Sequence, residues 1–90
     1  MSDTAFKALS DATRREILRL LGKREMSVGE IVDNFAMSQP SISRHLAVLR
    51  NAGLVTTRRE GQNVVYGLDT TVMQDVVRAL MDLSGRRKSP

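Results

Sequence analysis

The segment 38–50 of this 90-residue chain combines a helix start with a narrow apolar stripe, and it constrains the fold more than any other stretch. Ser38 is a good N-cap, because its hydroxyl accepts a backbone N–H that has no partner inside a helix. Pro40 suits a first turn, and Gly53 is a natural stop. The apolar positions recur at helical spacing: Ile42, Leu46 and Leu49. The pattern predicts a short helix that buries one side.

The opposite side of this helix carries short hydrogen-bonding groups and a cation, without a carboxylate: Gln39, Ser41, Ser43, Arg44 and His45. Arginine pairs with guanine and glutamine with adenine in the major groove, and hydroxyls and arginine contact phosphates. This side is therefore a candidate DNA-reading surface. The solvated face of an ordinary amphipathic helix is the alternative interpretation.

The residues before this helix predict a helical partner for it. After a short first helix, Asp11 caps a helix over 12–21. Ser27 and Glu30 have the spacing of a capping box and open a further helix that ends near Phe35. A short link then leads to the helix at 38–50, which is the arrangement of a helix-turn-helix whose second helix reads DNA.

A β wing is predicted after the reading helix. Segments 54–59 and 63–68 are β-prone, and Gly61 between them suits a tight turn. Alternating side chains of the second strand are expected on the inward face: Val64, Tyr66 and Leu68. Arg58 and Arg59 lie near the tip, within reach of phosphates or a minor groove.

Positive charge is concentrated on these two elements. No Asp or Glu occurs from residue 34 to residue 59, whereas four arginines do: Arg44, Arg50, Arg58 and Arg59. The whole chain has 14 basic and 10 acidic residues, a net charge of +4. The charge of the segment 34–59 alone is therefore equal to the net charge of the whole chain. Solvated surfaces usually mix both signs. Because DNA affinity depends largely on phosphate neutralisation, the distribution favours duplex DNA as the partner.

The last helix, which begins near Thr71, has an apolar stripe too wide for one contact in a domain this small. Part of it is expected to face a second copy, together with the first helix. The expected dimer interface is Phe6, Leu9, Val72, Met73, Val76, Leu80 and Leu83. The alternative is that the apolar residues of the last helix are all intramolecular core.

The fold class is therefore mostly α with a small β-hairpin (α+β), in the order α-α-α-α-β-β-α. Residues 1–85 are expected to form one DNA-binding and dimerisation domain, and residues 86–90 a flexible basic tail. The chain has no cysteine, which excludes disulfides and thiolate metal sites. It shows no secretory signal or membrane span, so we expect a cytoplasmic protein. No catalytic constellation or cofactor motif is present, and an enzyme is not expected.

In combination, five segments closely resemble the ArsR/SmtB family: 6–18, 38–46, 49–55, 59–62 and 66–68. The short length and the segment 69–75 resemble its SdpR-like autorepressor branch. The resemblance implies a winged helix-turn-helix homodimer that represses transcription from a near-palindromic operator, often that of its own operon. The expected DNA-contacting set is Gln39, Ser41, Ser43, Arg44, His45, Arg58, Arg59 and Gln62, with His45 the weakest member.

The chain departs from family members that sense metals through cysteines or through Asp/His clusters on the last helix. That helix contains Asp75 and Asp82 but no histidine, and the single imidazole of His45 is a poor metal site. No metal site is expected. A repressor of the same fold gated by a metal or small molecule remains the alternative function. The basic segment 34–59, which has no carboxylate, argues against a protein-interaction module that does not bind DNA, whereas relief of repression by a protein partner stays open.

Overall fold

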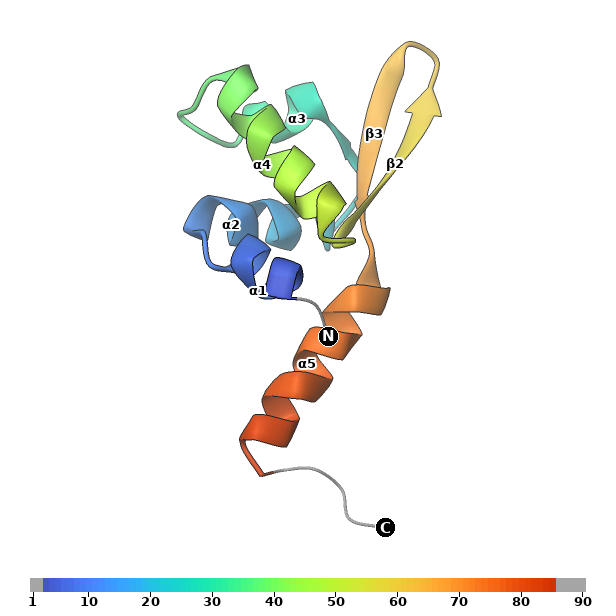
Figure 1. The fold of residues 1–90 in the computed structure, drawn as a ribbon. Coiled ribbons are helices and arrows are strands. Elements are labelled where there is room, and N and C mark those ends of the chain that lie inside the picture. The colour runs from blue at the N-terminus through green and yellow to red at the C-terminus, as the bar shows by residue number, and fades with distance from the viewer. Residues whose placement is uncertain (1–2, 86–90) are drawn as a thin grey trace.

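The computed structural model describes residues 3–85 and places them in five helices and a three-stranded sheet (Figure 1). In chain order the elements are α1 (Asp3–Leu9), α2 (Ala12–Leu21), β1 (Met26–Ser27), α3 (Val28–Val32), α4 (Gln39–Asn51), β2 (Val55–Glu60), β3 (Asn63–Leu68) and α5 (Thr70–Leu83). The predicted order is confirmed with one addition, strand β1. The expected tail, 86–90, lies outside the described residues. Within residues 3–85, no helix is long and apolar enough to cross a membrane.

Local capping decides where α3 and α4 begin. The Ser38 hydroxyl accepts the N–H of Ser41 at 3.3 Å. Ser27 and Glu30 form both arms of a capping box, at 3.3 Å and 3.0 Å. Beyond the far end of α4, Gly53 has a φ of +75°, a conformation that a Cβ would strain. The predicted starts and stop of these helices are confirmed.

The link between α3 and α4 is longer than predicted. Helix α3 ends at Val32 rather than near Phe35, and residues 33–38 connect it to α4. Asp33 and Asn34 follow the last helical residue, and short polar side chains of this kind favour turns over helix interiors. Phe35 still packs against the core, but from a turn in which its N–H donates to the Val32 carbonyl at 3.0 Å. The helix-turn-helix arrangement is retained.

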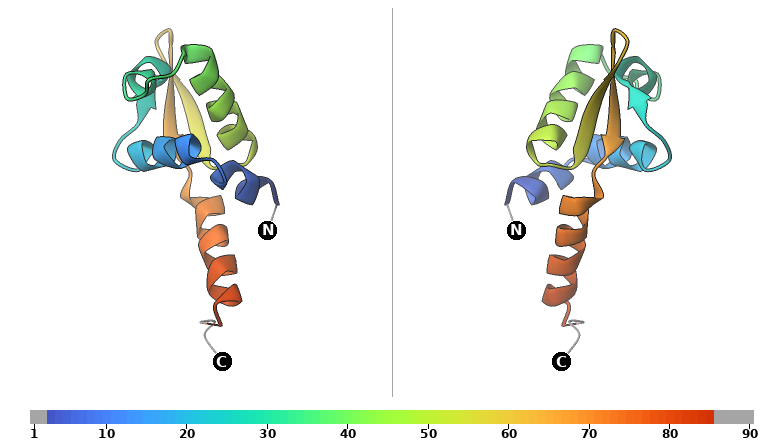
Figure 2. Two further views of the ribbon diagram at one scale, coloured as in Figure 1. Left: turned by 90° about the vertical axis from the view of Figure 1, so that its left-hand side faces the viewer. Right: turned by 90° about the vertical axis from the view of Figure 1, so that its right-hand side faces the viewer.

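The antiparallel sheet has the strand order β1-β3-β2, and β2 and β3 form a wing beside α4 (Figure 2). Val55 pairs with Leu68 at the base of the wing. Tyr66 and Leu68 pack against the core as predicted. Val64 shares this strand face as predicted, but it is 37% exposed and does not pack against the core. The wing rises beyond the body there, so its outer part has nothing to pack against.

The apolar stripe of α4 is fully buried. Ile42, Leu46 and Leu49 are 0%, 1% and 0% exposed, and they join one cluster with Ile17 of α2 and Ile31 of α3. Burial of each such side chain contributes about 1.5–3 kcal/mol. The stripe therefore fixes the rotation of α4 and directs its polar side outward.

Helix α5 begins at the edge of the body beside α1 and extends away from it (Figures 1 and 2). Val72 and Met73 pack against the core, and Val76 is only 3% exposed. Leu80 and Leu83, farther along, are 51% and 82% exposed. The inclusion of Val76 in the expected dimer surface is therefore corrected: this residue lies where α5 still passes α1 and is buried within the chain.

Candidate nucleic-acid interface

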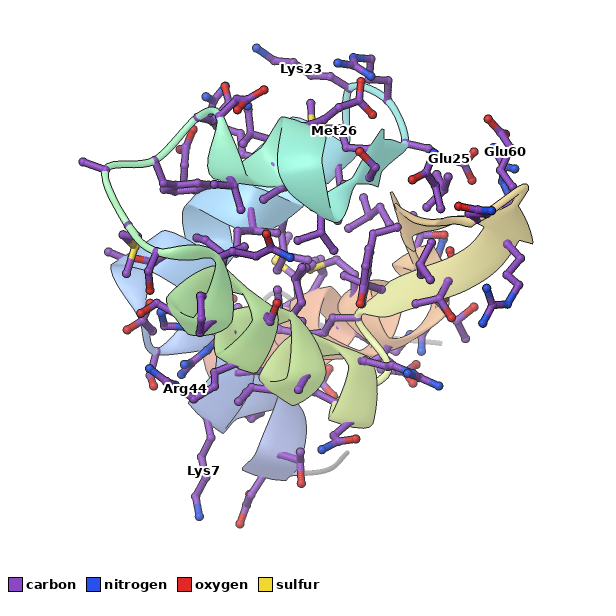
Figure 3. The ribbon with its side chains drawn as sticks, turned by 90° about the horizontal axis from the view of Figure 1, so that it is seen from above. Lys7, Lys23, Glu25, Met26, Arg44 and Glu60 are labelled. Carbon is purple, nitrogen blue, oxygen red and sulfur yellow. The ribbon has the colours of Figure 1, made fainter. Side chains whose placement is uncertain are left out.

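The outward side of α4 brings together four of the predicted reading residues. Gln39, Ser43 and Arg44 are exposed, and Ser41 is half-buried. The Ser38 hydroxyl donates to Ser41 Oγ at 3.0 Å, and Arg44 Nη2 lies 3.5 Å from the same oxygen. Figure 3 shows Arg44 extending outward from the helix. The first turns of α4 therefore present an amide, hydroxyls and a guanidinium, a set that can contact base edges and phosphates.

His45 does not lie with these residues. Its side chain is 18% exposed and faces α2, where Nδ1 lies 3.3 Å from Arg14 Nη1 and 3.9 Å from Asp11 Oδ1. Asp11 is the N-cap of α2 and accepts the Arg14 N–H at 3.1 Å. The hydrogen bond from that N–H is the main reason why the pKa of the Asp11 carboxyl is lowered. This position leaves His45 little surface for DNA.

Val48 is an exposed apolar residue of α4 that the sequence analysis did not include in the site. It is 37% exposed and lies one turn beyond Arg44 on the same side of the helix. An apolar side chain there can contact a thymine methyl group. The sequence could have indicated this exposure, because Val48 falls outside the apolar stripe of Ile42, Leu46 and Leu49.

Arg58, on the wing, is paired with two carboxylates. Its Nη2 donates to Glu25 Oε1 at 2.7 Å, its Nε to the same oxygen at 3.1 Å, and its Nη1 to Glu60 Oε2 at 2.7 Å. Figure 3 shows Glu25 and Glu60 on the same side of the wing. These hydrogen bonds, chiefly those that Glu25 accepts, raise the pKa of the Arg58 guanidinium, and Arg58 in turn lowers the pKa of the Glu25 carboxyl. Both carboxylates come from outside the segment 34–59, which contains none: Glu60 directly follows it, and Glu25 is brought to Arg58 by the fold.

Arg59 lies on the other face of the wing. It pairs with Val64, and because strand side chains alternate, it shares a face with Val55 and Tyr66, the face that packs against the core. Within residues 3–85 it makes no ion pair, and Gln62 at the nearby turn is exposed. Arg59, rather than Arg58, is therefore the wing cation available to a phosphate.

Carboxylate and imidazole groups are scattered in this fold. Among the residues that the structure describes, no three His, Cys, Asp or Glu side chains are grouped so that they could hold a metal ion. The imidazole of His45 lies beside Arg14 and Asp11, and a guanidinium has no lone pair for a metal.

Comparison with known proteins gives a consistent result. Residues 11–57 match the family model described as "Bacterial regulatory protein, arsR family". The chain is 44% identical over 80 residues to the transcriptional repressor SdpR of Bacillus subtilis, covering 89% of each protein. It is 42% identical over 74 residues to the transcriptional activator HlyU of Vibrio cholerae, covering 82% of this chain and 68% of HlyU. An ArsR-like transcriptional regulator from Rhodococcus sp. RHA1 superposes with a TM-score of 0.87 at 30% identity, covering 93% of this chain and 77% of that one.

Proposed function

Because this chain belongs to the arsR family of bacterial regulatory proteins, and is thus a DNA-binding transcription regulator, we propose that it is a homodimeric repressor. Two α4 helices enter successive major grooves of a near-palindromic operator, about 34–36 Å apart. The observation that carries this proposal is the outward side of α4, where Gln39, Ser43 and Arg44 are exposed on a helix without a carboxylate. The site includes Ser41, Arg59 and Gln62, but not the paired Arg58.

The exposed apolar surface of α5 supports a dimer. Leu80 and Leu83 extend its buried stripe past the body, and Val77 and Met81 beside them are 51% and 47% exposed. Phe6 of α1 is 36% exposed, and α1 contacts α5. Contiguous apolar patches of this kind mark interaction sites, and a second copy related by two-fold symmetry would cover both helices at once.

Repression rather than activation is proposed from SdpR, a repressor that the chain matches over 89% of both lengths. HlyU, an activator, shows that similar chains are linked to the opposite effect. The test is a reporter fused to a promoter that footprinting shows to be bound. Reporter expression should fall as the protein is induced. A rise in expression, or footprints that lie wholly upstream of promoters, would count for activation.

Arg44 is expected to read a base. Arg44→Ala should cost about 1–3 kcal/mol at one operator position and remove the preference there, since a bidentate contact to guanine is lost. Binding of a complete set of single-base operator variants measures this preference. Arg50→Ala is the matched control, because Arg50 is also exposed but lies in the last turn of α4. Equal losses on operator and random DNA for Arg44→Ala would refute base reading.

Arg58 and Arg59 form a matched pair of wing cations with different expected effects. Arg59→Ala should weaken binding to all sequences and reduce the salt slope of log K by about 1, because one phosphate contact is lost. Arg58→Ala should leave the slope within experimental error, since its guanidinium is already bound by Glu25 and Glu60. Titrations of a random duplex between low and moderate salt compare the two. The reverse ranking would show that DNA displaces the carboxylates.

A further inference from the structure

Arg14 is the only described side chain that hydrogen-bonds both to α1 and to α4. From α2, its Nε donates to the Ala8 carbonyl at 2.7 Å and its Nη2 to the Lys7 carbonyl at 3.0 Å, both at the C-terminal end of α1. Its Nη1 lies 3.3 Å from Nδ1 of His45 on α4. One planar group therefore joins the first helix to the reading helix.

The chemistry of these contacts gives the junction a definite geometry. The last carbonyls of a helix have no partner within it, and a cationic donor there is favourable. A guanidinium can only donate, so Arg14 and His45 share a hydrogen bond in the tautomer whose Nδ1 accepts and whose ring proton is on Nε2. Because the five N–H groups form a rigid fork, the two bonds to α1 fix the direction of the third. Asp11 and Arg14 are the charged groups that face the imidazole.

We propose that Arg14 is a positioning residue for operator recognition: acting through His45, it sets the angle of α4 relative to α1. The inference rests on the proposed dimer, in which α1 and α5 lie at the two-fold axis. A fixed angle between α1 and α4 then fixes the distance and rotation between the two reading helices. Arg14 thereby determines which half-site spacing the dimer accepts, without touching DNA.

Arg15 provides a matched control. It is the next residue of α2, and its Nη1 also donates to the end of α1, to the Leu9 carbonyl at 2.7 Å. Within residues 3–85 it has no hydrogen bond to α4. Arg14→Ala and Arg15→Ala therefore both remove a cap from α1, but only Arg14→Ala removes the link to the reading helix.

The half-sites are first identified by footprinting with the unaltered protein. The experiment then measures the affinity for three duplexes, in which the spacing between the half-sites is native, one base pair shorter or one base pair longer. Each added base pair also rotates one half-site about the DNA axis, so the unaltered protein should prefer the native spacing. Arg14→Ala should lower affinity for the native spacing about 5-fold or more, the scale of coupling between residues in contact, and should flatten the preference. Arg15→Ala should keep the preference. Identical spacing profiles for the two variants would overturn the proposal.

His45 variants test the same link if Arg14→Ala does not fold, which circular dichroism shows. His45→Ala should flatten the spacing preference, and His45→Asn should restore it, because the amide oxygen can replace Nδ1 as acceptor. Any other pattern from these two variants overturns the proposal. If the unaltered protein binds no duplex, or binds only as a monomer, the proposed function fails instead, so the two failures are distinct.

Discussion

Leu80→Asp is expected to convert the protein from a dimer into a monomer and to weaken operator binding severely. Leu80 is 51% exposed in the single chain and continues the stripe of α5 past the body. In the proposed dimer this position is covered, and an unpaired carboxylate buried there costs about 3–5 kcal/mol. A monomer engages one half-site and loses the advantage of two linked contacts, so operator affinity should fall about 100-fold or more. Analytical ultracentrifugation and gel-shift titration measure the two effects.

Thr71→Asp is the control for this substitution. Thr71 is an exposed residue of the same helix, and the helical repeat places it on the side opposite Leu80. It introduces the same charge, so its variant should remain a dimer and bind the operator normally. A Leu80→Asp protein that stays dimeric at low micromolar concentration would rule out this face as the interface.

Leu46→Ala is expected to have the largest effect on stability. Leu46 is 1% exposed, at the centre of the stripe that holds α4 in the core. Leu→Ala substitutions at such positions lower the free energy of unfolding by about 2–5 kcal/mol, through lost transfer energy and the cavity left behind. That is a large part of the 5–15 kcal/mol that is typical of whole domains. Urea unfolding followed by circular dichroism, at fixed protein concentration, measures the change.

Val48→Ala is the control that distinguishes the loss of core packing from a general sensitivity of α4 to side-chain truncation. Val48 is on the same helix but is 37% exposed, so its truncation should change the free energy of unfolding by about 0.5 kcal/mol or less. A loss of less than about 1 kcal/mol for Leu46→Ala would mean that the core collapses around the missing side chain more fully than such cores do.

Features that depend on neighbouring residues could be predicted from the sequence. The cap at Ser38, the box formed by Ser27 and Glu30, and the turn at Gly61 each need only a few adjacent positions. The buried stripe of α4 follows from helical periodicity alone. These local signals were sufficient for the fold, because a helix-turn-helix with a wing consists of short elements joined by short links.

Features that depend on distant residues could not be predicted. Strand β1 is two residues long and exists only because β3 is beside it. Glu25 reaches Arg58 across 33 positions of the chain, and Arg14 reaches His45 across 31. A count of charges along the sequence therefore treated Arg58 as unpaired, and the helical face alone assigned His45 to the DNA side. Both errors concern side chains whose partners come from another element.

In the proposed dimer, the projecting end of α5 would link the occupancy of the operator to the amount of protein present. The leucines at this end of α5 are exposed to solvent in the single chain and would be covered only in the dimer. Dimer formation then follows mass action, so the concentration of the DNA-binding dimer rises with the square of the monomer concentration when monomers predominate. Repression would then increase steeply over a narrow range of regulator concentration, rather than in proportion to that concentration. For a regulator that controls its own operon, this steepness would set a ceiling on its own abundance.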